Sequence, residues 1–155
     1  MRDELVYASI EPARVRHAMT IEALAEAPLI LSDASWGTED PTRRQLAELA
    51  QRVGVSIQPD IDVEDVEAAL ELAARGLGDT IVARGILLAL GRRVPKRLGW
   101  VHFDEPIYDT FAFIARANAP LSPASREFLT LARERLTELA RRLRTEPPRR
   151  RTPGG

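Results

Sequence analysis

The sequence contains no cysteine. That absence excludes disulfide bonds, thiolate metal sites and a cysteine nucleophile. Histidine is scarce as well: His17 and His102 lie far apart, and no His-x-x-x-His or Gly-x-Ser-x-Gly motif occurs. No segment combines a nucleophile, a base and a phosphate-binding loop. We therefore expect no enzyme activity, no cofactor and no metal site.

Long apolar runs and an excess of one charge are also lacking. No stretch approaches the roughly 20 apolar residues of a membrane-spanning helix. The first residues include acids and lack the apolar core of a signal peptide. The formal net charge is −1, from 22 basic and 23 acidic residues, so no overall field attracts nucleic acid or an anionic membrane. We expect a cytoplasmic protein without a membrane partner and without direct nucleic-acid binding.

What the sequence does contain is an alternation of strand and helix signals. Of its 155 residues 45% are hydrophobic, which is typical of a folded globular domain. Short apolar runs predict strands at 5–10, 29–31, 55–61, 80–83, 100–103 and 110–115. Helical signals lie at 21–26, 41–53, 63–75 and 85–91, and a last helix of about 20 residues starts at Ser122-Pro123. This alternation predicts an α/β fold with a mostly parallel sheet flanked by helices.

Capping signals mark the ends of these helices. Thr20 is the predicted N-cap of the first helix, and Asp40 with Pro41 starts the second, which ends at Gly54. Asp62 is the predicted N-cap of the helix at 63–75. Acidic residues gather at that point: Asp60, Asp62, Glu64, Asp65 and Glu67. We interpret them as favouring a helix start through its dipole, and not as a metal site.

Three segments carry a resemblance to a known family. LAEAPLILSD enters a strand, DVEDVEAALELAARGLGDTIVA joins a helix through Gly-x-Gly to a strand, and NAPLSPASREFLTLARERL places a Leu-Ser-Pro turn before a helix. In this order they resemble the C-terminal part of the effector-binding domain of LysR-type transcriptional regulators. The chain departs from that pattern at Ala83-Arg84-Gly85, where family members commonly have a proline. It contains no counterpart of the family's N-terminal helix-turn-helix.

The resemblance implies a partial fold like that of periplasmic binding proteins (type 2). Residues 1–26 would be a remnant of the first subdomain, 27–106 the effector-binding subdomain II, 107–144 a return strand with the C-terminal helix, and 145–155 a disordered tail. The strands at 5–10 and 110–115 would pair as part of that remnant. Because family members assemble through these domains, we also expect a homodimer, with the helix at 43–53 or 63–75 at the contact.

A ligand is expected at the carboxyl ends of the parallel strands. The candidate ligand-binding residues are Ser32, Asp33, Ser35, Trp36, Thr38, Val63 and Arg84. The loop after 29–31 offers hydroxyls, an aromatic ring and backbone N–H groups, and an arginine at a strand end can hold a carboxylate through two hydrogen bonds. We therefore expect a small-molecule effector that is a carboxylate or an aromatic compound.

Taken with the resemblance, these signals predict the effector-binding (sensor) domain of a LysR-family regulator, truncated so that it cannot bind DNA itself. An excised domain, a natural truncation and an accessory protein derived from a regulator all fit. Two other interpretations stay open: an oligomerisation or interaction fragment without a ligand, and a small α/β enzyme.

Overall fold

The computed structural model describes residues 1–116 and 120–145. A six-stranded sheet has the order β3-β2-β4-β1-β5, and β6 pairs with β1 outside that path. The strands are β1 (Arg2–Ser9), β2 (Leu29–Leu31), β3 (Ile61–Asp62), β4 (Asp79–Ala83), β5 (Gly99–His102) and β6 (Tyr108–Thr110). The helices are α1 (Ile21–Ala25), α2 (Pro41–Val53), α3 (Val66–Ala74), α4 (Arg84–Leu90) and α5 (Pro123–Thr145), with 3-10 turns η1 (Ala34–Glu39) and η2 (Gly91–Arg93).

The predicted α/β class is confirmed, but the sheet is mixed. β2 runs parallel to β3 and β4, whereas β1 runs antiparallel to β4, β5 and β6. β1 lies in the middle of the sheet, although the sequence suggested a remnant strand. Its first residues pair with β6 as Arg2↔Thr110, Asp3↔Asp109 and Glu4↔Tyr108. The predicted pairing of the two segments is therefore present with different residues, and the domain boundaries expected from the sequence stay predictions.

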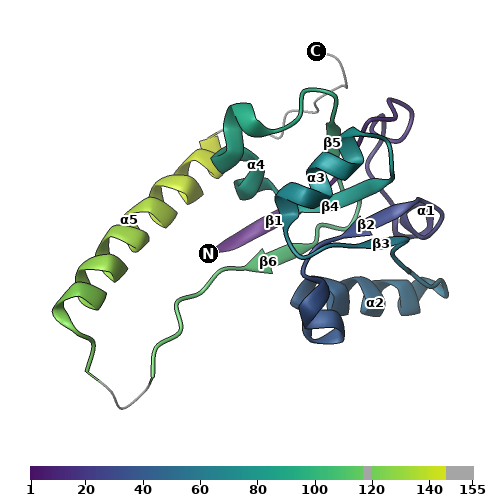
Figure 1. Ribbon diagram of the computed structural model, residues 1–155. Helices are drawn as coiled ribbons and strands as arrows, with labels where there is room; N and C mark the ends of the chain where they lie inside the picture. The colour runs from purple at the N-terminus through teal and green to yellow at the C-terminus, as the bar shows by residue number, and fades with distance from the viewer. Residues whose placement is uncertain (117–119, 146–155) are drawn as a thin grey trace.

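Apolar side chains cover both faces of the sheet, because successive strand residues point to opposite sides. On one face Leu5 and Tyr7 of β1 join a cluster that includes Leu24 of α1 and Leu46 and Ala50 of α2. On the other face Val6 and Ala8 join a cluster that includes Ala69 and Leu70 of α3 and Leu87 and Leu90 of α4. Figure 1 shows the resulting layers, with α2 on one side of the sheet and α3 and α4 on the other.

α5 stands away from these layers and contacts α4 (Figure 1). Ser122 caps its start by accepting a hydrogen bond from the Ser125 N–H at 3.1 Å, so the predicted helix start is confirmed. None of its residues is buried, and Phe128 and Leu131 expose most of their surface. Across the described residues no helix has both the length and the apolar composition for a membrane crossing.

Two predicted elements in the middle of the chain are wrong in extent. A strand was expected at 55–61, but the observed strand β3 covers only Ile61 and Asp62. Val55 and Ile57 pack against the core cluster on the α2 face, and so look like strand residues without pairing in the sheet. The helix expected at 63–75 begins at Val66, with Asp65 as its N-cap in place of Asp62. It starts late because the Val63 N–H donates to the Leu31 carbonyl at 3.0 Å, which continues the pairing with β2.

The strand expected at 110–115 is also wrong. β6 covers Tyr108–Thr110. After Thr110 two further bonds join Phe111 and Met1: the Phe111 N–H donates to the Met1 carbonyl at 2.8 Å, and the Met1 amino group donates to the Phe111 carbonyl at 2.6 Å. Pairing stops there because β1, its partner strand, starts at Arg2. The tail predicted at 145–155 falls outside the described residues except Thr145, which ends α5.

Candidate functional site

A cleft opens where β2 and β4, two parallel strands, end. It encloses about 570 Å³, a size typical of small-molecule sites. Its apolar lining comes from the strands and α4: Leu5, Leu31, Ile81, Val82, Ala83 and Ile86. The remaining lining residues are Ser32, Asp33, Asp40, Pro41, Thr42, Gln45, Glu64, Asp65, Val66, Tyr108, Asp109, Thr110 and Phe111. We refer to this hollow as the cleft.

Two helices begin at the cleft, and each is capped by its own aspartate. Asp40 accepts a hydrogen bond from the Arg43 N–H at 2.8 Å, and Asp65 accepts one from the Ala68 N–H at 2.8 Å. A carboxylate at this position satisfies an otherwise unpaired N–H and lies favourably in the helix dipole. The starts of α2 and α3 are therefore already occupied by negative side chains.

Two of the predicted site residues line the cleft. Ser32 and Asp33 follow β2 directly, and the Ser32 hydroxyl donates to the Asp33 carboxylate at 2.9 Å. Asp33 has a left-handed backbone conformation with φ of 60°, which aspartate tolerates better than most residues. The Ser32 carbonyl accepts a hydrogen bond from the Arg43 guanidinium at 2.9 Å, so the loop is tied to α2.

Three further predicted residues, Ser35, Trp36 and Val63, are not among the described residues that line the cleft. The Ser35 hydroxyl donates to the Glu64 carboxylate at 2.6 Å, and the Trp36 side chain is 64% exposed. Val63 packs against the core cluster on the α3 face. Thr38 lies in η1, and its side chain is outside the described part of the structure. Ligand contacts of these residues stay predictions.

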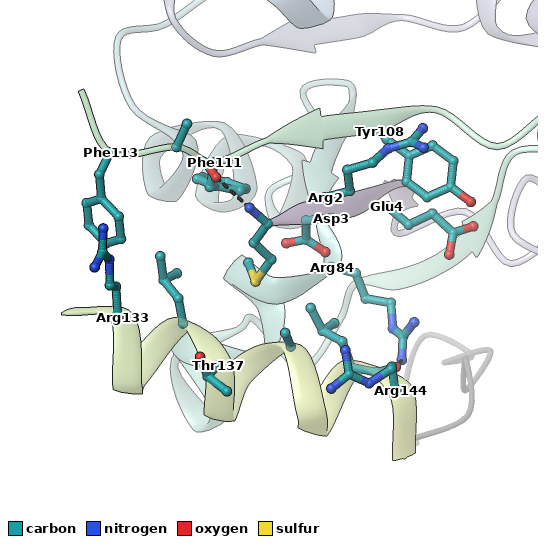
Figure 2. A pocket seen from close by; sticks show the side chains of 15 residues that line it. Arg2, Asp3, Glu4, Arg84, Tyr108, Phe111, Phe113, Arg133, Thr137 and Arg144 are labelled. Atoms are coloured by element: carbon teal, nitrogen blue, oxygen red, sulfur yellow. Dashed lines mark hydrogen bonds between the residues drawn. The ribbon is translucent and has the colours of Figure 1, made fainter. Parts of the chain in front are cut away.

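Arg84 lies in a different hollow. We refer to this hollow, which encloses about 790 Å³ between α5 and the start of β1, as the α5 groove. Figure 2 shows Arg84 near Arg144 at one end of the groove, and Phe113 beside Arg133 at the other. The Arg84 guanidinium donates to the Leu143 carbonyl at 2.8 Å. The structure thus separates Arg84 from Ser32 and Asp33, which the sequence had placed together.

A buried carboxylate closes the inner side of the α5 groove (Figure 2). Asp3 accepts a hydrogen bond from the Gly85 N–H at 2.7 Å. Burial raises the pKa of Asp3, against the lowering effects of this hydrogen bond and of the Arg84 charge. The contact fixes the start of β1 to the first turn of α4.

Residues of α2 and β6 that complete the cleft were not predicted from the sequence. The Thr42 hydroxyl donates to Asp109 at 2.7 Å, and the Gln45 side chain donates to the Tyr108 carbonyl at 3.1 Å. Thr42 and Asp109 are 67 residues apart in the chain, so no local motif links them.

The charges in the cleft influence one another. Burial raises the pKa of Asp109, and the carboxylates of Asp40 and Asp33 raise it further, while the hydrogen bond from Thr42 lowers it. Like charges close together disfavour the ionised form. The cleft is therefore a region of negative potential.

We expect this pKa shift to appear in the pH dependence of stability. Because folded Asp109 binds its proton at a higher pH than the unfolded chain, its contribution is present below the unfolded pKa of about 3.9 and is lost as the pH rises through its folded pKa. As the pH falls from about 7 towards the unfolded pKa of about 3.9, the free energy of unfolding of the wild type should increase relative to that of Asp109→Asn. Urea unfolding across this pH range measures the difference between the two proteins, and the exposed Asp104→Asn serves as the control. The same pH dependence in the wild type and in Asp109→Asn would contradict the expectation.

The other acidic residues near α3 have separate partners. The Asp60 carboxylate accepts a hydrogen bond from the Leu29 N–H at 2.9 Å, and Asp62 pairs with Arg43 at 2.5 Å. The capping interpretation is therefore confirmed for Asp65 but not for Asp62. No group of three or more histidine or acidic side chains within 1–116 and 120–145 is arranged to hold a metal ion.

Comparison with known proteins agrees with this geometry. Residues 5–137 match the LysR substrate binding domain. No curated protein matches the chain significantly. No helix-turn-helix domain is detected in it.

Several solved structures share the fold. The effector binding domain of QuiR in complex with shikimate has a TM-score of 0.64 at 19% identity, covering 88% of this chain and 63% of that one. HinK, a LysR family transcriptional regulator from Pseudomonas aeruginosa, has a TM-score of 0.65 at 17% identity, covering 90% and 47%. The BenM effector binding domain with its effector benzoate has a TM-score of 0.57 at 18% identity, covering 96% and 64%.

The TM-scores show a shared fold, whereas identities this low show nothing more. The chain spans less than two thirds of the length of each of these structures. The family match covers nearly all of the sheet and most of α5. The chain therefore belongs to the LysR substrate-binding domain family, which is not a family of enzymes.

Proposed function

We propose that this chain is the sensor part of a LysR-type transcriptional regulator and binds a small-molecule effector in the cleft. The cleft itself carries the proposal: about 570 Å³ at the ends of two parallel strands, with an apolar lining and polar groups around it. QuiR and BenM are similar domains seen with shikimate and benzoate. The cytoplasmic location expected from the sequence stays a prediction.

The route from the cleft to the rest of the molecule runs through β6. Tyr108, Asp109 and Thr110 line the cleft, and this strand pairs with the start of β1. Beyond it the chain leads to α5. An effector that contacts both the β2 end and β6 would favour one position of α5 over others, and a ligand shifts such an equilibrium only through differential binding. In this proposal α5 is the element that reports occupancy of the cleft.

Self-association is part of the same proposal. The sequence suggested a homodimer through α2 or α3, but both helices have residues buried against the sheet. Most of the exposed large apolar side chains lie on α5 or in the segment before it, namely Phe111, Phe113, Ile114, Phe128 and Leu131, whereas Trp36, Val53 and Leu77 lie elsewhere. We infer that contacts between copies form there, because apolar groups of this size favour a protein interface. This surface is also what an interaction fragment without a ligand would use.

A melting experiment tests effector binding. Thermal unfolding is followed with and without shikimate, benzoate, benzylamine and related small carboxylates and aromatics. A ligand at 100 times its dissociation constant should stabilise the fold by about 2.7 kcal/mol and raise the melting temperature by several degrees. Thr110→Trp, at an exposed position that lines the cleft, should abolish the rise. Gln51→Trp, at an exposed position near the end of α2 that is not among the described cleft residues, should leave it unchanged.

Two results would contradict the proposal. One is a rise in melting temperature that Thr110→Trp leaves intact, because the ligand would then bind elsewhere. The other is the absence of any rise across the whole panel while the unliganded protein melts cooperatively. The second result would favour the interaction fragment.

A further inference from the structure

The lining of the cleft carries five carboxylates and no basic side chain. The acids are Asp33, Asp40, Glu64, Asp65 and Asp109, and no lysine, arginine or histidine occurs among the described residues that line the cleft. Five negative charges around about 570 Å³ are a strong departure from the balance of the whole chain, whose net charge is −1. The imbalance is therefore local to the cleft.

None of these five carboxylates forms an ion pair with another residue of 1–116 and 120–145. The hydrogen bonds to the five carboxylates come from backbone N–H groups and from the hydroxyls of Ser32, Ser35 and Thr42. Every ion pair found within 1–116 and 120–145 involves other acids. A hydrogen bond from a neutral donor stabilises a carboxylate but leaves its charge, so the negative potential persists in the cleft.

The groups that usually attract an anion are already engaged. Asp40 and Asp65 occupy the starts of α2 and α3, and Glu64 accepts a hydrogen bond from the Ser35 N–H at 3.2 Å. Arg84, the residue expected to hold a carboxylate, donates to Leu143 in the α5 groove. A carboxylate ligand would therefore meet like charges on this wall.

We propose that the effector is an organic amine, whose ammonium group lies among these carboxylates while its hydrocarbon part covers the apolar lining. The inference rests on the proposed function and specifies its ligand class. The opposite charge would gain Coulomb attraction in a partly desolvated site, and the lining of Leu31, Ala83 and Ile86 would gain apolar contact. Shikimate and benzoate, seen with two similar domains, are carboxylates, so this chain would differ in ligand class.

Three probes of similar shape are benzylamine, benzyl alcohol and benzoate. They share a phenyl ring and differ in charge, so they separate the effect of ligand charge from that of the ring. Each is titrated into the isotope-labelled protein at low salt while the backbone amides of the cleft are followed by NMR. Benzylamine should shift the amides of Ser32, Asp33 and Thr110 and bind at least about tenfold more tightly than benzyl alcohol, which should bind more tightly than benzoate. Added salt should weaken benzylamine most, because screening reduces attraction between charges.

Matched variants locate the effect. The double variant Asp33→Asn with Asp109→Asn keeps the left-handed turn and the Thr42 hydrogen bond available, since asparagine suits both. It should remove most of the preference for benzylamine over benzyl alcohol. Asp104→Asn changes an exposed carboxylate outside the cleft and should leave the preference intact.

Each contrary outcome has a distinct meaning. Tighter binding of benzoate than of benzylamine at the same amides would overturn the amine class and leave the proposed function standing. Equal binding of benzylamine and benzyl alcohol would overturn it as well, because charge would then contribute nothing. If none of the three probes shifts a cleft amide at millimolar concentration, the inference fails, and the melting panel with Thr110→Trp decides the proposed function separately.

Discussion

Replacing Asp79 with alanine should lower the free energy of unfolding by about 3 kcal/mol. The Asp79 side chain is 2% exposed and accepts hydrogen bonds from the Tyr7 hydroxyl and the Arg14 guanidinium. Alanine would leave a fully buried tyrosine hydroxyl without its acceptor and Arg14 without its counter-ion. We expect the lower end of the range for broken buried pairs, because Arg14 is 39% exposed and can regain water.

Urea unfolding measures this loss, and two variants calibrate it. Tyr7→Phe should cost about 1 kcal/mol, since Asp79 keeps its ion pair with Arg14. Asp104→Ala removes an exposed carboxylate and should stay within about 0.5 kcal/mol of the wild type. A loss for Asp79→Ala no larger than that control would contradict the role assigned to the buried network. Burial and the Asp79 carboxylate raise the pKa of Tyr7, so its hydroxyl remains a donor at ordinary pH.

The position of this network separates stability from ligand binding. Asp79 starts β4, whereas the cleft is lined by Ile81, Val82 and Ala83 towards the other end of the strand. Arg14 lies in the loop after β1, so the network ties that loop to the strand. We therefore expect Asp79→Ala to shift the melting temperature without changing which ligand raises it. A variant with both effects would indicate that strain at the start of β4 reaches the cleft.

Features encoded by neighbouring residues were predicted correctly. Thr20 accepts the Ala23 N–H at 3.1 Å, Asp40 caps α2, and Gly54 ends it with φ of 75°. The short run Leu29–Leu31 is a fully buried strand, as its apolar composition predicted. Each of these depends on contacts within a few residues, or on burial from both sides, and both leave a pattern in the sequence.

Features that depend on distant residues were missed. The apolar run of β1 fits a strand at the edge of a sheet as well as one in its centre. Its central position follows only from its pairing with β4 and β5, which the run itself does not reveal. Ser32 and Asp33 follow a recognisable strand and line the cleft, while their contact with a ligand stays a prediction. Asp109 lines the cleft from β6, a strand that carries no ligand motif, and so it was not predicted. Arg84 was predicted in the site but lies in the α5 groove, where it donates to the Leu143 carbonyl of α5.

Gly78 shows how closely β2 and β4 approach one another beside the core. It lies just before β4, where the Asp79 N–H donates to the Pro28 carbonyl at 2.7 Å. A Cβ at Gly78 would lie 2.8 Å from that carbonyl oxygen and 2.9 Å from the Ile30 Cγ1 atom. The first of these atoms is main chain, so it cannot move without displacing β2.

Gly78→Ala should therefore lower the free energy of unfolding by about 3 kcal/mol, the upper end of the usual cost of overpacking. Gly76→Ala is the matched comparison, because Gly76 has φ of 80° and its Cβ would meet only the end of the Ile10 side chain, at 3.1 Å. A left-handed alanine costs about 1–2 kcal/mol, so Gly76→Ala should be the milder change. Urea unfolding of both variants gives the order. A larger loss at Gly76 would mean that β2 can shift to accommodate the Cβ at Gly78. The left-handed backbone at Gly76 would then be the main reason for glycine between α3 and β4.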